Sequence, residues 1–159
     1  MAREHPEPGE FLAHANEVVV GEIALGKFIT MAYLTVDGSG ALRCASAGHP
    51  QPRLLRSDGS VEELDCGGLA LGIDAPQQYE EVHARLPIGG AIVLYTDGVV
   101  ESRSGSELFG VERLDAVLAK HAGRPAQAVA DAVLAACRDF AGGDLPDDCA
   151  VVVIRRVAA

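Results

Sequence analysis

The stretch Ala91-Ile-Val-Leu-Tyr-Thr-Asp-Gly-Val-Val-Glu101 decides how the rest of the chain is interpreted. Residues 91–95 form a continuous apolar run, which is typical of a strand that is buried on both faces. Asp97 follows at once, so a carboxylate lies at the rim of the core, where an unpaired charge is costly unless it has a hydrogen-bonded, cationic or metal partner. The alternative is a plain turn, since Asp and Gly are both favoured in turns for local backbone reasons.

Composition indicates a globular protein and excludes several classes of partner. The 159 residues, with 48% apolar and 23% charged side chains, predict a single domain over residues 1–159. No apolar run approaches the roughly 18 residues of a membrane span, and no apolar stretch follows a basic start as in a secretory signal. We therefore expect a cytoplasmic protein without a membrane partner. Thirteen basic against 23 acidic residues give a net charge of −10, which argues against nucleic acid as a partner.

The spacing of apolar residues predicts strands first, then helices, then one more strand. This order is typical of an α+β layered domain. The glycine-rich segment 66–72 is interpreted as a plain connection. In chain order we expect a helix over 11–23, a strand over 28–36 paired with 41–47, a hairpin of 53–56 with 60–64, strands over 79–86 and 91–95, helices over 111–118 and 129–140, and a final strand over 150–154.

The cysteines do not indicate a zinc or redox site. Cys44, Cys66, Cys137 and Cys149 show no Cys-x-x-Cys spacing. Cys44, Cys137 and Cys149 lie in apolar segments, so we expect them to be small core residues.

Carboxylates lie at one end of two of the predicted buried strands. Asp97 follows strand 91–95, and Asp147-Asp148 precede strand 150–154. If the two strands are antiparallel neighbours, these ends are separated by only about one strand spacing, ~4.8 Å. Carboxylates so close repel each other unless a proton or a cation lies between them. Oxygen ligands without Cys or His favour Mg²⁺ or Mn²⁺ over zinc.

Several short motifs follow one another in a fixed order: Phe28-Ile-Thr30, Ala47-Gly-His-Pro50, Leu71-Gly-Ile73, Tyr95-Thr-Asp-Gly-Val99, Glu101, Phe109-Gly110 and Asp147-Asp148. Taken together they resemble one protein family, the bacterial PP2C-type serine/threonine phosphatases of the SpoIIE/RsbU-like branch. The resemblance implies an α/β/β/α sandwich with a metal cluster at one end of its two sheets. It also implies hydrolysis of phosphoserine or phosphothreonine by a water held between two Mn²⁺ or Mg²⁺ ions, and a phosphoprotein substrate of the anti-sigma-factor antagonist type.

The resemblance assigns roles to a few of these residues. Asp97 and Asp147 match the family's catalytic metal aspartates, and Asp148 occupies a neighbouring polar position that we retain as a candidate metal ligand. His49 is either a general acid or a residue that braces its loop, and the resemblance favours bracing. For Glu101 a helix-start or loop contact is favoured over metal binding. Thr96 is expected to satisfy backbone groups beside the site.

The chain departs from the family pattern at its N-terminal end. Residues 1–27 contain no Gly-Asp-x-x-Gly-His-Gly motif, whose aspartate bridges the two metals in the family, so the resemblance covers about the last two-thirds of a family domain. The Asp-Gly pairs at 37–38 and 58–59 fall in hairpin turns and do not replace it. Two functions remain open: a phosphatase whose metal affinity in this chain is weak, and a catalytically inactive interaction module.

The same departure leads to an expectation about assembly. If strand 28–36 is apolar on both faces and lacks neighbours, its open edge and apolar patch favour pairing with another copy. We therefore expect a homodimer.

Overall fold

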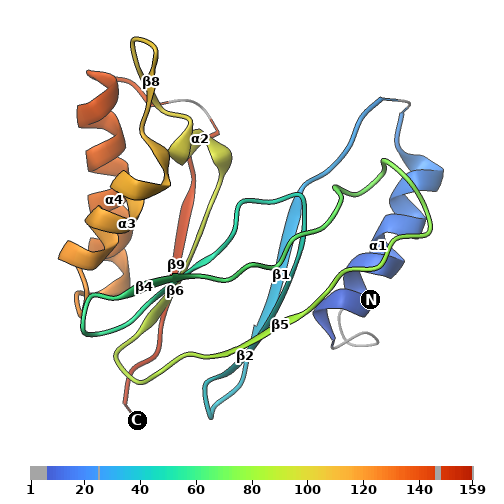
Figure 1. Cartoon of the computed structure of the whole chain (residues 1–159), viewed down its shortest axis with the longest axis horizontal. Coiled ribbons are helices and arrows are strands. Elements are labelled where there is room, and N and C mark those ends of the chain that lie inside the picture. The colour runs from blue at the N-terminus through green and yellow to red at the C-terminus, as the bar shows by residue number, and fades with distance from the viewer. Residues whose placement is uncertain (1–6, 25, 146–147, 159) are drawn as a thin grey trace. The chain divides into compact units, whose positions relative to one another are not determined.

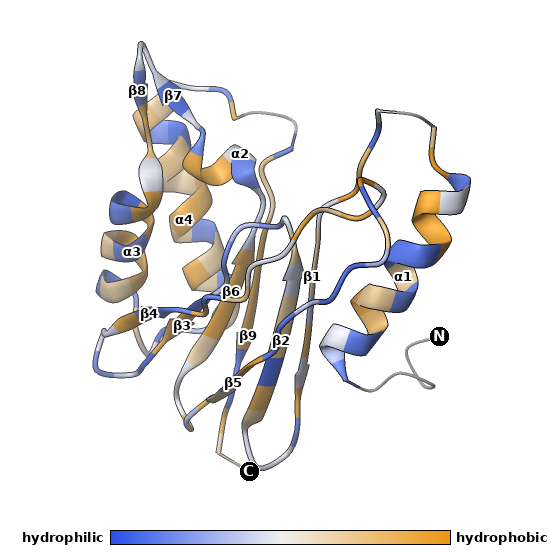
Figure 2. Cartoon of the chain, turned by 45° about the vertical axis from the view of Figure 1, so that its right-hand side comes forward, coloured by the Kyte–Doolittle hydropathy of each residue, from blue (hydrophilic) through white to orange (hydrophobic). Residues whose placement is uncertain are grey.

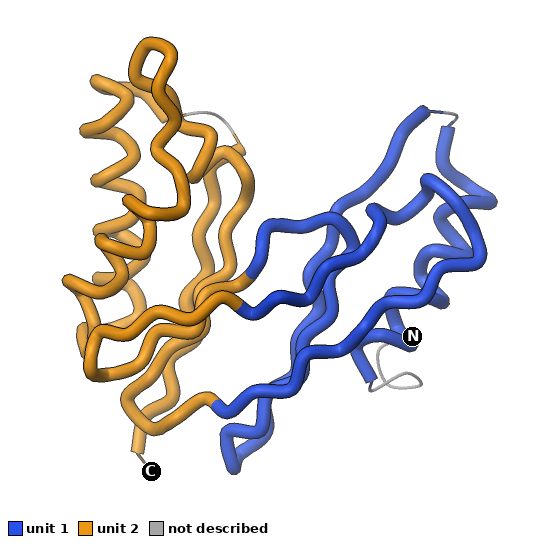
Figure 3. The backbone as a smooth tube through the Cα atoms, in the orientation of Figure 1, with its two compact units in different colours: residues 1–51, 64–85 blue, residues 52–63, 86–159 orange. Residues whose placement is uncertain are grey.

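The fold is known from a computed structural model, which describes residues 7–24, 26–145 and 148–158 (Figure 1). The chain divides into two compact units (Figure 3). Residues 1–51 and 64–85 form unit 1, and residues 52–63 and 86–159 form unit 2. Among the described elements, unit 1 combines a sheet with one helix and unit 2 a sheet with several helices, which agrees with the α+β class predicted from the apolar pattern.

Unit 1 is built on a three-stranded antiparallel sheet with the order β1-β2-β5. Its strands are β1 (Met31–Val36), β2 (Ala41–Ala47) and β5 (Val82–Arg85). Helix α1 (Pro8–Glu22) has a proline in its first turn, where the missing N–H costs nothing. Leu12 and Ala15 of α1 are buried in a cluster with Ala45 and Ala47 of β2. The helix thus covers the sheet through residues spaced by about one turn.

A buried asparagine fastens α1 to the glycine-rich segment. Asn16 has no exposed surface, its Nδ2 donates to the carbonyl of Asp74 at 2.8 Å, and its Oδ1 accepts from Gly72 N–H at 2.9 Å. Gly72 has a φ of +91°, and an added Cβ would lie 3.0 Å from the side chains of Val19 and Ile23. Residues 66–72 contain no helix or regular strand, as expected for a connection, and the contacts of Gly72 add that the end of this connection docks on α1.

The strand predicted over 28–36 is shorter than expected. Its regular part begins at Met31, while Ile29 makes only an isolated bridge to Leu71. The Phe28 side chain is 59% exposed. Strand β1 lies at the edge of its sheet, and its residues are half-buried or exposed. An open edge with exposed apolar side chains agrees with the expectation for a strand that lacks a neighbour on one side.

Unit 2 is built on an antiparallel sheet with the order β4-β3-β6-β9. Helices α3 and α4 pack against it, through Leu114 and Val133 among others, in one cluster with Val93 and Tyr95 of β6. Figure 2 shows polar and apolar residues alternating along both helices. The elements are β3 (Arg53–Leu55), β4 (Val61–Glu63), β6 (Ala91–Tyr95), α2 (Asp97–Val100), β7 (Arg103–Ser104), β8 (Glu107–Leu108), α3 (Gly110–Lys120), α4 (Ala126–Ala141) and β9 (Val151–Arg155).

The final strand is covered on one face only. Val151 and Val153 of β9 are half-buried, whereas Val152 and Ile154 are 55% and 39% exposed. The buried central strand β6 matches its predicted bounds, because its neighbours β3 and β9 and the helices enclose it. Within the described residues, no helix combines the length and apolar character needed to cross a bilayer.

Candidate functional site

The ends of β6 and β9 lie side by side, as the sequence predicted. The two strands pair antiparallel, with Tyr95 opposite Val151. The pairing continues for one more residue, because Thr96 N–H donates to the carbonyl of Ala150 at 3.0 Å. The chain that leaves β6 at Asp97 therefore lies beside the chain that enters β9. Asp147 falls outside the described residues, so its assignment as a metal ligand stays a prediction.

Thr96 joins the two segments with its side chain. Its Oγ1 accepts a hydrogen bond from Ala150 N–H at 2.8 Å and donates one to the carbonyl of Asp148. A β-branched residue is restricted at χ1, which helps to hold the hydroxyl in one direction. The expectation that Thr96 satisfies backbone groups beside the site is confirmed.

Asp97 and Asp148 both contact Gly98. Asp97 is exposed and opens the short helix α2, and its Oδ1 accepts from Gly98 N–H at 3.0 Å. A Cβ added to Gly98 would lie 2.6 Å from Asp148 Oδ1 and 3.1 Å from the Asp148 carbonyl carbon. Only glycine lets the Asp148 carboxylate pack this closely. The sequence left open whether Asp97-Gly98 is a turn or a site for a carboxylate. The pair does both, because it redirects the chain and positions a carboxylate.

The donor set at this edge suits a hard cation but is not a complete cage. Asp97 and Asp148 are both exposed and offer only oxygen, which Mg²⁺ and Mn²⁺ prefer, with water filling the remaining positions. Among the residues that the structure describes, no group of three or more His, Cys, Asp or Glu side chains is close enough to hold a metal ion. The residues present fit a weakly held divalent cation.

His49 braces its loop. The hydroxyl of Thr30 lies 3.3 Å from His49 Nδ1, and Ser46 Oγ both accepts from His49 N–H at 3.2 Å and donates to its carbonyl at 3.1 Å. These contacts join the Thr30 and Ala47–Pro50 motifs within unit 1. They support the bracing interpretation over general acid catalysis. Glu101 ends α2, where its backbone N–H donates to the Asp97 carbonyl at 2.8 Å. The role of its carboxylate stays a prediction.

Asp37 and Asp58 lie in hairpin turns, as predicted. Asp37 Oδ1 accepts from Ser39 N–H at 2.8 Å and from Ser39 Oγ at 2.7 Å. Asp58 Oδ1 accepts equivalent bonds from Ser60 at 2.9 and 2.7 Å. The serine hydroxyl bond is the main reason that the pKa of each carboxyl lies below its ordinary value. Both carboxylates are used in bracing the turns.

The cysteines are mainly core residues. Cys44, Cys66 and Cys137 are buried and Cys149 is half-buried. The Sγ atoms of Cys44 and Cys66 lie 3.1 Å apart. Their hydrogen bond, and then burial, raise the pKa of Cys44. Burial is the main reason that the pKa of Cys137 rises to about 11. Thiols with raised pKa values are poor nucleophiles and metal ligands, which supports the core interpretation.

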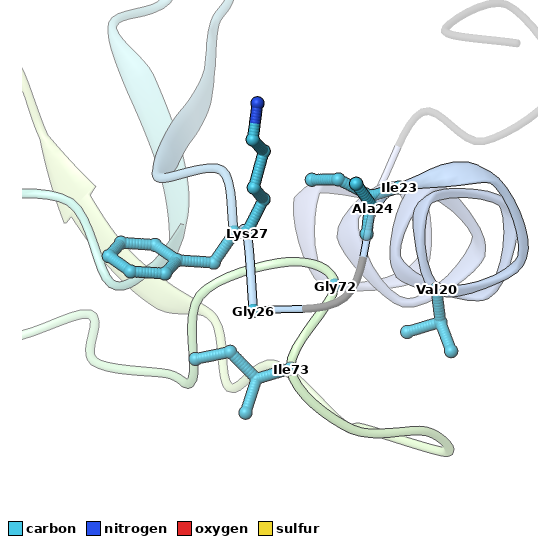
Figure 4. A pocket seen from close by; sticks show the side chains of 8 residues that line it. Val20, Ile23, Ala24, Gly26, Lys27, Gly72 and Ile73 are labelled. Carbon is cyan, nitrogen blue, oxygen red and sulfur yellow. The ribbon is translucent and has the colours of Figure 1, made fainter.

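Two cavities differ in chemistry. One, of about 420 Å³ in unit 1, is lined by Val20, Ile23, Phe28 and Ile73 and by one charged residue, Lys27 (Figure 4). It contains no carboxylate, so it does not suit a divalent cation. The other, of about 380 Å³ in unit 2, is lined by Gly98 and Asp148 and by further charged residues. This second cavity adjoins the candidate site.

Sequence reasoning missed two residues beside the second cavity. Ser102 is fully buried, and its Oγ donates to the Gly98 carbonyl at 2.8 Å. Arg103 lines the cavity. Residues 101–107 are polar and contain a glycine, which predicts a loop, so no local pattern distinguishes these two from solvated neighbours.

Comparisons with known proteins agree with this architecture. The family model for stage II sporulation protein E, SpoIIE, matches residues 1–157. Phosphoserine phosphatase RsbU of Bacillus subtilis is 29% identical over 151 residues, which are 94% of this chain and 45% of that protein. The SiaA-PP2C domain of Pseudomonas aeruginosa superposes with a TM-score of 0.80 at 23% identity, covering 96% of this chain and 61% of that one.

A third comparison is with the phosphatase domain of SpoIIE from Bacillus subtilis, whose crystals were presoaked in Mn. It has a TM-score of 0.70 at 18% identity and covers 93% of this chain and 65% of that one. The chain thus spans less than two-thirds of each of these relatives. It has the mixed helix-and-sheet fold of PP2C phosphatase domains, as expected. By the match over residues 1–157, the chain belongs to the SpoIIE family.

Proposed function

We propose that this chain is the greater part of a metal-dependent protein serine/threonine phosphatase domain, in which units 1 and 2 together form one domain. The observation that carries the proposal is the contact of Asp148 with the Asp97-Gly98 peptide, fastened by Thr96. It brings two carboxylates to one edge of a rigid sheet. The RsbU relative, which is named a phosphoserine phosphatase, supports the reaction class.

Asp97, Asp148 and Asp147 are the proposed ligands of Mn²⁺ or Mg²⁺, and Asp97 and Asp147 are the proposed catalytic pair. A bound divalent cation would lower the pKa of a water and neutralise charge on the phosphoryl group. The chain's own contribution is to hold the ligands. Thr96 restrains the backbone on which Asp148 lies, and Gly98 leaves room for its carboxylate.

The alternative function is that of an inactive interaction module. It is favoured by one observation, that no three-ligand metal cluster occurs among the described residues. The phosphatase proposal predicts that metal and phosphoserine act together, whereas the module requires neither.

We expect the chain with Mn²⁺ to release phosphate slowly from a phosphoserine protein of the anti-sigma-factor antagonist type, and not from phosphotyrosine. The rate should be low because few metal ligands are present. The measurement is mass spectrometry of the substrate after incubation with Mn²⁺ or with a chelator. Loss of phosphate that is unaffected by the chelator, or loss from phosphotyrosine alone, would contradict the proposal.

We further propose that two copies of the chain associate through the open edge of β1. Among the described strands, β1 pairs only with β2. Apolar side chains lie exposed beside it, with Phe28 at 59% and Ile29 at 43% exposure. Such edges recruit another strand. We expect light scattering at micromolar concentration to give twice the mass of the chain, and a monodisperse monomer would refute the pairing.

A further inference from the structure

The cavity of about 380 Å³ beside the candidate site contains a single cationic side chain. Arg103 shares its lining with the carboxylates of Glu101, Asp144 and Asp148. Despite these neighbours, Arg103 forms no ion pair with any carboxylate in the described part of the chain. Arg113, by contrast, is held by Glu107 at 2.8 Å. The guanidinium of Arg103 therefore keeps its donors available to a ligand.

The backbone that carries Arg103 is fixed to the candidate site. Ser102 precedes it, and the buried Ser102 hydroxyl donates to the carbonyl of Gly98 at 2.8 Å. The Ser102 carbonyl accepts from Phe109 N–H at 2.8 Å, which closes the base of the β7–β8 hairpin. Arg103 thus begins β7 directly after an anchor on the peptide next to Asp97. Positioning from such an anchored base lowers the entropy lost when a ligand is bound.

The chemistry of this arrangement selects a phosphoryl group. A guanidinium offers a planar fork of donors that matches phosphate oxygens in pairs, and charge-assisted bonds of this kind are stronger than neutral ones. The three carboxylates around the cavity repel an anion, so binding there requires cationic charge. Arg103 is the one cationic residue that lines the cavity.

We propose that Arg103 binds the phosphoryl group of a phosphoserine substrate in this cavity. The inference rests on the proposed phosphatase function and adds a substrate-binding residue to it. Removing the guanidinium leaves only carboxylates among the charged lining residues. Its loss should therefore weaken binding of the phosphorylated ligand and leave binding of the unphosphorylated one unchanged.

The test is fluorescence anisotropy of a labelled phosphoserine peptide and its unphosphorylated form, titrated with the full chain in Mn²⁺. A hydrogen bond to a charged group contributes about 1.5–3 kcal/mol, so Arg103→Ala should weaken phosphopeptide binding by about 10-fold or more. Arg103→Lys should retain part of the affinity, because it keeps the charge and loses the fork. Arg124→Ala removes an exposed cation in the turn before α4 and should bind like the wild type.

The outcomes separate this inference from the proposed function. The role of Arg103 is supported if the wild-type chain prefers the phosphopeptide, if Arg103→Ala abolishes this preference, and if Arg124→Ala preserves it. This holds whether or not hydrolysis follows. Equal preference in the wild type and Arg103→Ala overturns the inference and leaves the phosphatase proposal standing if phosphate is released. A wild-type chain that binds both peptides equally overturns the inference, and absent hydrolysis then also counts against the proposed function.

Discussion

Replacing Asp97 by asparagine is expected to lower the affinity of the chain for Mn²⁺ by about 100-fold. Changing a residue that only orients a metal ligand costs roughly 10- to 100-fold in affinity, and a direct ligand should reach the upper end of that range. The substitution keeps the size of the side chain and removes its charge. Asp97 is exposed at the start of α2, so the fold should tolerate the change. Isothermal titration calorimetry, extended to millimolar Mn²⁺, measures the effect.

The matched control is Asp58→Asn. Asp58 is an exposed carboxylate that Ser60 binds in the turn between β3 and β4. Its replacement removes the same charge from the same unit, so a general electrostatic effect on cation binding would appear in both variants. Equal affinities for the Asp97 and Asp58 variants would show that Asp97 is not a ligand.

The sequence predicted the strands correctly where the local apolar pattern agrees with the burial that the folded structure imposes. Strand β6 has its predicted bounds because its apolar run is enclosed by neighbouring strands and helices. Strand β2 also matches, because the turn at 37–40 precedes it and Gly48, whose φ is +68°, follows it. The pairing of β2 with β1 followed from the turn between them.

Where sequence failed, the deciding contact was remote or the local pattern was weak. The docking of Gly72 depends on Asn16, which lies 56 residues earlier in the chain. Helix α2 was missed because Asp97-Gly98 combines two poor helix formers, and tertiary contacts with the segment around Asp148 stabilise it. The β7–β8 hairpin was missed because strands of two exposed residues each leave no periodicity to detect.

Only part of the candidate site could be predicted from the sequence. Two carboxylate-bearing ends were predicted to meet because strand adjacency follows from the fold, and the pairing of β6 with β9 confirms this. Arg103 was not predicted, because its place beside the cavity depends on the buried Ser102 hydroxyl and on the hairpin. The position of such a residue depends on contacts outside its own segment, so the local sequence pattern does not reveal it.

Arg53→Ala is expected to destabilise the chain by about 3 kcal/mol at neutral pH. The Arg53 side chain is 3% exposed, pairs with Glu63 of β4, and has its Nε 3.2 Å from Asp115 Oδ1 of α3. Breaking a fully buried pair by removing one partner costs about 3–5 kcal/mol, because a buried charge is left without compensation. Here only the guanidinium is buried, whereas Glu63 and Asp115 are 49% and 38% exposed, so the loss should lie at the lower end of that range. Unfolding by urea, followed by circular dichroism, measures the loss.

The effect should shrink as the pH falls. Burial raises the pKa of Asp115, while Arg53 opposes the rise. When the pKa of a carboxyl is higher in the folded state than in the unfolded state, that carboxyl favours folding most at low pH. This contribution is lost as the pH rises from the pKa of the unfolded state through the pKa of the folded state. Without Arg53 the folded pKa of Asp115 rises further, so the variant loses more stability than the wild type over that interval. Below it Asp115 is protonated and needs no cation.

Arg56→Ala is the matched control for this prediction. Arg56 follows the same strand and pairs with Glu62, but both side chains are substantially exposed, at 37% and 52%. Exposed pairs contribute about 0–1 kcal/mol, so this variant should remain close to the wild type at every pH. A loss for Arg53→Ala no larger than that for Arg56→Ala would mean that the buried guanidinium contributes nothing beyond a surface charge. A loss that is large but independent of pH would assign its role to packing of the aliphatic stem between β3 and α3, and not to compensation of Asp115.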